Sequence, residues 1–154
     1  MKHLYLMRHA SASHGFADFD RPLNLEGRKQ LEVLCAKNVG FFDGVSAVLC
    51  STATRTRQTC AGIADLFLPS TAYHFLDSLY HAPAETVLEE IRLLPDATQS
   101  VFIIAHNPGV SEFLGLSSVP VSMTMGTAQI ACFDTTIESW SQLNFKDCVF
   151  QEIR

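Results

Sequence analysis

The chain has 154 residues, of which 47% are hydrophobic and 18% are charged. This length and composition fit one domain with a sizeable core and exclude a disordered or collagen-like chain. Sixteen Asp and Glu against eleven Lys and Arg give a formal net charge of −5. That balance argues against a nucleic-acid-binding protein, because such a protein needs a basic face to neutralise phosphates.

Neither a membrane-spanning segment nor a secretory signal is expected. The apolar runs are too short to cross a bilayer, and the short run at the start is interrupted by Arg8 and His9. The five cysteines are odd in number and contain no Cys-x-x-Cys pair, which favours reduced thiols. We therefore expect a cytoplasmic protein without a membrane partner.

Short apolar runs alternate with segments of helical periodicity in the first half of the chain. Asn24 is a suitable helix N-cap, and Pro69 is expected to end the second helical segment. In chain order the predicted elements are a strand at residues 4–7, a helix from Asn24 through Cys35, a strand at 45–50, a helix at 53–68 and a weaker, peripheral strand at 72–76.

The alternation continues in the second half. Pro83 suits the first turn of a helix whose periodicity extends to Pro95. The run at 101–105 is apolar at every position, as expected for a central strand covered on both faces. The remaining predicted elements are a short helix after Pro108 and strands at 128–134, 141–145 and 149–153.

Strands that alternate with helices predict a three-layer α/β/α sandwich around a mostly parallel sheet. In such sheets, ligands bind beyond the carboxyl ends of the strands. The first strand ends in Arg8 and His9, the second leads into a helix with Arg55 near its start, and the central strand ends in His106. Two imidazoles and two guanidiniums are therefore expected to meet at one edge of the sheet.

This set of side chains suits phosphoryl transfer. A guanidinium binds two phosphoryl oxygens at once and keeps its charge, and a neutral imidazole has a nucleophilic nitrogen that can attack phosphorus. No metal or other cofactor is required when arginines and a second histidine supply the positive charge. The six histidines also lack an HxxEH or comparable metal-ligand spacing.

Four motifs resemble, in the same order, those of the histidine phosphatase superfamily and its short SixA-type phosphohistidine phosphatases. Residues 4–10 resemble the family's strand followed by Arg-His-Gly, and residues 20–27 resemble its Arg-x-Leu-Thr-x-x-Gly element. Residues 51–59 are similar to Ser-Pro-x-x-Arg-Ala-x-Gln-Thr, and residues 103–109 to the second-histidine signature. The resemblance covers nearly the whole chain and implies a phosphoglycerate mutase-like fold in a single catalytic domain, residues 1–154.

The resemblance also implies the roles of the main site residues. His9 would be the nucleophile that carries a transient phosphoryl group. Arg8, Arg55 and His106 would form the phosphate pocket around it, and His106 would stabilise the transferring group by hydrogen bonding.

Other residues near these motifs have lesser implied roles or depart from the family pattern. Arg21 and Asn107 are expected to border the same pocket and bind phosphate or substrate. Arg57 should point to another face of its helix than the pocket arginine, and we interpret it as structural or solvated. Ala10 stands for the family's Gly and Thr52 for its Pro, and both changes are expected to leave the chemistry intact.

The proton donor for the leaving group is not identified by the motifs. Mutase and acid-phosphatase branches of the superfamily carry a catalytic Glu near residues 79–82, where this chain has none. The candidate substitutes are Asp18, Asp20, His81 and Glu85, each of which also fits a solvated loop or helix start. A chain without a strong acid should favour a leaving group that departs easily, such as the protonated imidazole of phosphohistidine.

The sequence thus predicts a metal-independent phosphatase that removes phosphate from phosphohistidine on a signalling protein of the histidine phosphotransfer type. The loop at 11–23 is the main segment able to border the site, which favours an open pocket that admits another protein's side chain. Two alternatives stay open: a phosphatase of small phosphate monoesters, and a non-catalytic module that binds phosphorylated partners. The sequence does not indicate the oligomeric state.

Overall fold

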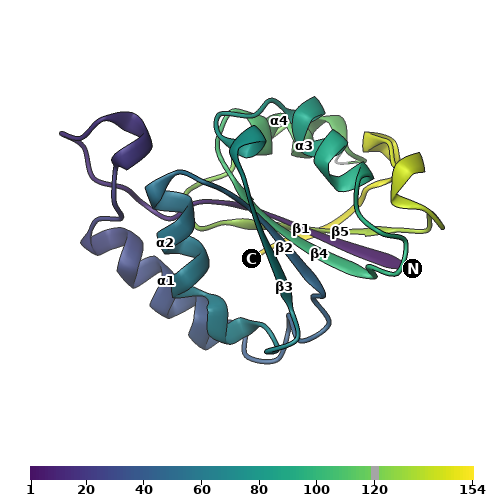
Figure 1. Ribbon diagram of the computed structural model, residues 1–154, viewed down its shortest axis with the longest axis horizontal. Helices are drawn as coiled ribbons and strands as arrows, with labels where there is room; N and C mark the ends of the chain where they lie inside the picture. Colours follow the sequence, from purple (N-terminus) through teal and green to yellow (C-terminus); the bar gives the residue numbers. More distant parts are fainter. Residues whose placement is uncertain (119–121) are drawn as a thin grey trace.

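The computed structural model describes residues 1–118 and 122–154 and places a six-stranded sheet between two layers of helices (Figure 1). The strands are β1 (Lys2–Arg8), β2 (Ala47–Ser51), β3 (Ala72–Leu76), β4 (Ser100–Ala105), β5 (Ile130–Thr135) and β6 (Val149–Ile153). The helices are α1 (Leu25–Lys37), α2 (Thr54–Gly62), α3 (Ala84–Arg92) and α4 (Gly109–Leu116).

The strand order is β3-β2-β4-β1-β5-β6. The first four strands in this order are mutually parallel, and β5 and β6 extend the sheet as antiparallel strands. Helices α1 and α2 cover one face of the sheet, and α3 and α4 cover the other (Figure 1). The predicted three-layer α/β/α sandwich with a mostly parallel sheet is confirmed, and β3 lies at the sheet edge as expected.

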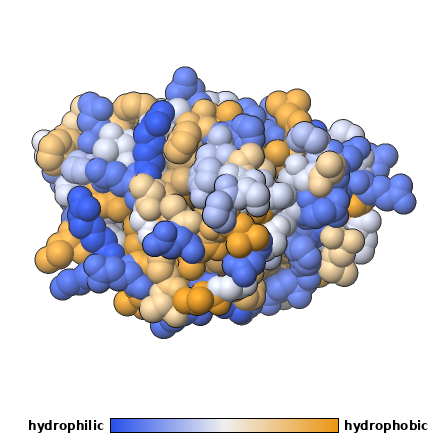
Figure 2. All heavy atoms as spheres, turned by 60° about the horizontal axis from the view of Figure 1, so that its bottom comes forward, coloured by the Kyte–Doolittle hydropathy of each residue, from blue (hydrophilic) through white to orange (hydrophobic). Residues whose placement is uncertain are grey.

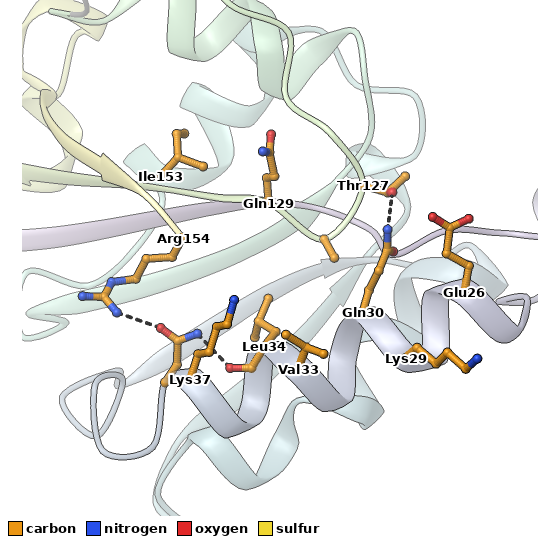
Figure 3. Close-up of a pocket in the computed structure, with 12 residues that line it drawn as sticks. Glu26, Lys29, Gln30, Val33, Leu34, Lys37, Thr127, Gln129, Ile153 and Arg154 are labelled. Carbon is orange, nitrogen blue, oxygen red and sulfur yellow. Dashed lines mark hydrogen bonds between the residues drawn. The ribbon is translucent and has the colours of Figure 1, made fainter.

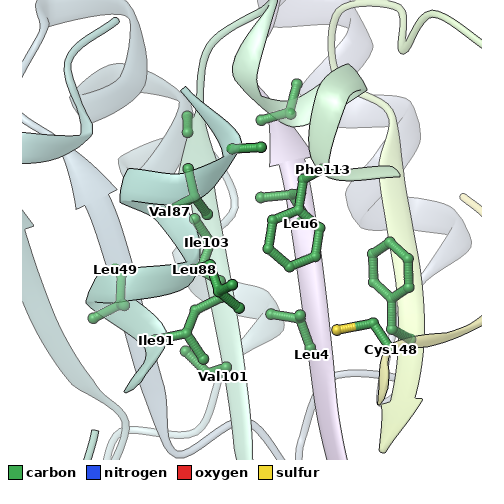
Figure 4. Close-up of a cluster of buried hydrophobic side chains, with 14 of the residues drawn as sticks. Leu4, Leu6, Leu49, Val87, Leu88, Ile91, Val101, Ile103, Phe113 and Cys148 are labelled. Atoms are coloured by element: carbon green, nitrogen blue, oxygen red, sulfur yellow. The ribbon is translucent and has the colours of Figure 1, made fainter. Parts of the chain in front are cut away.

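Side chains that alternate along the central strands fill two separate cores, because successive residues of a strand point to opposite faces. Leu6 and Ile103 belong to the core beneath α3 and α4, where they lie near Phe113 (Figure 4). Met7 and Phe102 belong to the core beneath α1 and α2. Every residue of β4 is buried, which explains why this strand has no polar face.

Helix α1 begins as predicted, because the Asn24 side chain accepts a hydrogen bond from the Gly27 amide at 2.8 Å. Helix α2 is shorter than the predicted 53–68, since it ends at Gly62 and gives way to a 3₁₀ turn. The amide of the fully buried Ile63 is shared between two carbonyls of the preceding turn. This tightening ends the helix well before Pro69.

The prediction of a strand at 141–145 is wrong. The segment instead forms the 3₁₀ turns Trp140–Gln142 and Phe145–Asp147. The buried Trp140 indole donates to the Thr98 carbonyl at 2.8 Å, which holds the segment against the end of the sheet. The other tail strands are present as β5 and β6, and helix α3 ends at Arg92, slightly before Pro95.

The surface is mixed in character. On the face shown in Figure 2, hydrophilic and hydrophobic residues are interspersed in small groups. Over residues 1–118 and 122–154, none of the helices has both the length and the hydropathy that crossing a bilayer demands.

Helix α4 packs directly on the backbone of the segment that precedes α3. A Cβ atom at Gly109 would overlap the backbone carbonyl oxygen of Ala82. Gly109 therefore lets the start of α4, which follows β4, approach the segment at residues 81–83. This contact matters because His81, and Asn107 just before α4, line the candidate site described below.

We predict that Gly109→Ala lowers the free energy of unfolding by about 1–3 kcal/mol, because the added methyl group must displace a backbone carbonyl. Gly115→Ala is the matched control in the same helix, since its Cβ would meet no atom of the described residues within 4 Å. That variant should be unchanged or more stable by up to about 1 kcal/mol. Urea denaturation measures both, and equal stability of the two variants would contradict the packing argument.

Candidate active site

A pocket of about 320 Å³ opens at the carboxyl ends of the parallel strands. The six site residues predicted from the sequence all line it, and they are Arg8, His9, Arg21, Arg55, His106 and Asn107. The loop at 11–23 also borders the pocket. Segments far apart in the chain are therefore brought together at the carboxyl ends of the strands, where they were expected.

Strand register explains why the two histidines meet. Arg8 of β1 pairs with Ala105 of β4, so both strands end at the same level. His9 and His106 each follow their strand by one residue, and their ring centroids are 5.3 Å apart. Both are nearly buried, with 7% and 2% of their surface exposed.

Arg55 lies between the two imidazoles. It is the second residue of α2 and is 2% exposed. Its Nε donates to His9 Nε2 at 3.3 Å, and its Nη2 is 3.2 Å from His106 Nδ1. Because a guanidinium has only donors, both of these ring nitrogens must accept.

These contacts fix the proton positions on both rings. His9 donates from Nδ1 to the Ala10 carbonyl at 2.7 Å, which leaves the Nε2 lone pair directed toward Arg55. His106 bonds from Nε2 to the Ser51 hydroxyl at 2.8 Å. Sequence reasoning did not single out Ser51 as a site residue, although its position at the end of β2, inside the motif at 51–59, was a usable signal.

Both imidazoles are neutral at neutral pH. Burial lowers the pKa of His9 to about 4, and the charges of Arg55 and Arg8 add to this against the opposing Ala10 hydrogen bond. Burial and the adjacent Arg55 lower the pKa of His106 to about 3. Neutral His9 keeps the lone pair that a nucleophile needs.

Arg8 supplies a second guanidinium with unused donor capacity. Its Nη1 donates to the Met125 carbonyl at 3.0 Å. Its Nε is buried and has no hydrogen-bond partner among the described residues. A buried N–H group without a partner costs free energy. An anion in the pocket could accept from this unpaired Nε–H group, so the site suits an anion.

Arg21 and Asn107 line the pocket but already bond to the protein. Arg21 Nε donates to a loop carbonyl at 2.8 Å, and its Nη1 lies 3.3 Å from an Asp18 oxygen. Asn107 donates to the Met125 carbonyl and accepts from the Ser111 hydroxyl. Both residues brace the walls of the pocket in this structure.

Arg57 lies away from the pocket, as interpreted from the sequence. Its Nε donates to the Thr52 carbonyl at 2.9 Å, and its guanidinium lies over the Phe75 ring at 4.7 Å. It therefore has a structural role on the outer side of α2.

The mouth of the pocket holds a cluster of polar contacts around Asp18. Its carboxylate accepts from Tyr80 Oη, from His81 Nε2 at 2.8 Å and from Arg55 Nη2 at 3.2 Å. The hydrogen bonds from Tyr80 and His81 hold the pKa of Asp18 well below its usual range. Tyr80, which had no role in the sequence analysis, thus fixes an ionised Asp18 at the mouth.

The structure separates the four candidate proton donors. Asp18 and His81 line the pocket, whereas Glu85 lines a different hollow beside α4 and Asp20 is exposed in the loop. Within the described ranges, no three His, Cys, Asp or Glu side chains are grouped so that they could hold a metal ion. Three arginines, Arg8, Arg21 and Arg55, line the pocket.

A second hollow, of about 550 Å³, lies between α1 and the end of β6 (Figure 3). Gln30 points from α1 to the Thr127 hydroxyl and donates to it at 2.9 Å (Figure 3). Its side-chain oxygen accepts from the Ser11 amide at 2.9 Å. Because Ser11 and Thr127 both line the candidate active site, Gln30 forms the partition between the two hollows.

Curated relatives come from mycobacteria, and no family model matches the chain. The uncharacterised protein Rv1276c of Mycobacterium tuberculosis is 37% identical over 109 residues, which cover 68% of this chain and 65% of that protein. The uncharacterised protein ML1117 of Mycobacterium leprae is 32% identical over 113 residues, or 68% and 66% of the two chains. The chain thus spans slightly less than two thirds of these relatives.

Solved structures give a fuller match. The SixA protein from Nakamurella multipartitia, named as a phosphohistidine phosphatase, has a TM-score of 0.85 and 27% identity over 99% of this chain and 95% of that one. The SixA protein from Agrobacterium tumefaciens has a TM-score of 0.77 and 28% identity over 87% and 92%. In its fold, and in a pocket on which its four motifs converge, the chain is similar to these SixA members of the histidine phosphatase superfamily.

Proposed function

We propose that this chain is a metal-independent phosphohistidine phosphatase in which His9 is the nucleophile. The observation that carries the proposal is the state of the His9 ring. Its Nδ1 proton is hydrogen-bonded to the Ala10 carbonyl, and its Nε2 lone pair faces a buried guanidinium in the pocket of about 320 Å³. This arrangement suits attack on a tetrahedral phosphoryl group bound by arginines.

The first step transfers the phosphoryl group to the protein. A phosphorylated side chain enters with its phosphoryl oxygens between Arg8 and Arg55, which exchange their present contacts for bonds to oxygen. The His9 Nε2 lone pair forms a bond to phosphorus while the bond to the leaving nitrogen breaks. His106 stabilises the transferring group by hydrogen bonding once its proton lies on Nδ1, with the Ser51 hydroxyl turned to donate to Nε2.

Water completes the cycle. It attacks the phosphorus of phosphorylated His9, the bond to Nε2 breaks, and inorganic phosphate leaves with the imidazole restored. The substrate we propose is phosphohistidine on a signalling protein of the histidine phosphotransfer type. The phosphohistidine phosphatase names of two structural neighbours above 25% identity support this choice over small monoesters.

We further propose that residues 1–154 form a single catalytic domain that acts in the cytoplasm. All five cysteines lie within the described ranges and are free thiols, and four of them are buried. Reduced cysteines of this kind fit a reducing compartment. Burial raises the pKa of Cys132 and of Cys148 to about 12, so neither thiol competes as a nucleophile.

We predict that His9→Asn lowers phosphatase turnover by at least about a thousandfold, because the attacking nitrogen is lost. Wild-type protein incubated with a ³²P-labelled phosphohistidine protein should carry acid-labile, base-stable label on His9, and the variant should carry none. His74→Asn on the exposed face of β3 is the control and should behave as wild type. Label on another residue, or full activity of His9→Asn, would reject the mechanism.

Arg8 and Arg57 should differ in their effect on anion binding. Arg8→Ala removes a buried donor that faces the pocket, and we expect the Kd for inorganic phosphate to rise by roughly 10- to 100-fold. Arg57→Ala removes only an outer contact and should leave that Kd within about twofold. Isothermal titration calorimetry measures both, and equal losses would argue against the assigned anion site.

The low pKa of His9 predicts that kcat/KM falls only at unusually acidic pH. Its neutral, nucleophilic form is present at neutral pH and is lost only as the pH falls through its folded-state pKa of about 4. With 2,4-dinitrophenyl phosphate, and after correction for substrate ionisation, kcat/KM should stay nearly flat down to about pH 5. An acid limb near the ordinary histidine value of 6.5 would show that the ring is less desolvated than the structure indicates.

A further inference from the structure

Phosphohistidine places special demands on a proton donor. When the phosphorus–nitrogen bond breaks, its electron pair stays on the departing imidazole, and the ring leaves easily only when its other nitrogen is protonated. That other nitrogen lies on the side of the ring away from phosphorus. The donor must therefore stand at the mouth of the pocket and not beside the phosphoryl oxygens.

His81 stands at this place. It lines the pocket, yet 52% of its side chain is exposed, so it belongs to the rim. Its ring is stacked on His106 with an angle of 7° between the planes and 5.5 Å between the centroids. The His81 imidazole thus extends from the phosphate-binding centre outward, in the direction that a leaving side chain must take.

Asp18 orients this imidazole. Its carboxylate accepts from His81 Nε2 at 2.8 Å. His81 Nδ1 has no hydrogen-bond partner among the residues that the structure describes. When His81 is an imidazolium, the proton on Nε2 stays hydrogen-bonded to Asp18, and the proton on Nδ1 is the one that can be transferred.

The backbone at His81 is strained. Its φ of 51° lies in the left-handed region, which residues other than Gly seldom adopt, although His, Asn and Asp do so more often than the rest. The following residue, Ala82, is held against Gly109 by the close packing described above. Such strain persists where the surrounding structure enforces it, and it gathers at functional sites.

His14 is a second exposed imidazole that lines the pocket, but His81 is the one that Asp18 orients. The groups in contact with His81 or Asp18 cannot supply the proton. Asp18 is ionised, and its hydrogen bond raises the pKa of Tyr80, so the phenol keeps its proton. His106 is neutral, with a pKa of about 3, and Arg55 is a permanent cation. Imidazole is the side chain that gains and loses a proton most readily near neutral pH.

We propose that His81, oriented by Asp18, protonates the distal nitrogen of the leaving imidazole. This inference rests on the proposed function. As the His9 Nε2–phosphorus bond forms and the substrate's phosphorus–nitrogen bond breaks, the His81 Nδ1 proton moves to the distal nitrogen of the leaving ring. A neutral imidazole departs, and His81 regains its proton from water.

His81→Asn separates proton donation from structure. Asn tolerates a left-handed backbone and its amide can donate to Asp18, but it has no proton to transfer. The measurement is the single-turnover rate of His9 phosphorylation from a phosphohistidine protein and from 2,4-dinitrophenyl phosphate, whose phenolate leaves without a proton. We expect a loss of about 100-fold or more with the first substrate and less than about threefold with the second.

His81→Gly provides a second variant that relieves the strained backbone. It should melt at the wild-type temperature or above, because Gly adopts this conformation at little cost. Phosphorylation from the phosphohistidine protein should be as slow as in His81→Asn, and added imidazole should restore part of the rate. A histidine with a purely structural role would not respond to imidazole.

The outcomes separate this inference from the function on which it rests. If wild-type protein forms phosphorylated His9 from both substrates and the two variants slow neither, or slow both equally, His81 is not the proton donor. If wild-type protein forms no phosphorylated His9 from either substrate, the proposed function fails and this inference fails with it. Inorganic phosphate should bind His81→Asn with the wild-type Kd, which confirms an intact pocket.

Discussion

The whole site depends on one buried guanidinium that needs acceptors. Arg55 cannot lose its charge or reach bulk water, so it must be met by lone pairs. His9 and His106 provide two of them, and this requirement sets which nitrogen of each ring carries the proton. Burial, with the charge of Arg55, keeps both rings neutral. The same contact therefore places the donors for an anion and prepares the attacking nitrogen beside them.

The sheet brings these residues together although they lie far apart in the sequence. Parallel strands that end at one level deliver His9, Ser51 and His106 without long loops. The backbone carbonyl of Ala10 and the hydroxyl of Ser51 then take the remaining ring protons. Because these partners belong to rigid strand ends, the rings are oriented before any ligand arrives.

Sequence patterns predicted the layers and the central arginine–histidine group, because apolar runs and strand-end motifs are local signals. They identified Asp18 and His81 as candidate proton donors but not the contacts that join these residues to each other and to Tyr80 at the rim. Asp18 meets Tyr80 and His81 across more than sixty residues, and periodicity carries no trace of such a contact. The strand prediction for residues 141–145 was wrong for the same reason. A long-range contact, the hydrogen bond from the Trp140 indole to the Thr98 carbonyl, decides the conformation there despite the segment's apolar composition.

The absence of a side chain at Gly109 has a consequence for the mouth of the pocket. Because α4 packs on the Ala82 carbonyl without an intervening atom, a larger residue at 109 would displace the turn that carries Tyr80 and His81. These two residues bond to Asp18, which in turn bonds to Arg55. A substitution at the start of a helix outside the pocket would therefore reach the guanidinium at its centre by way of the entrance.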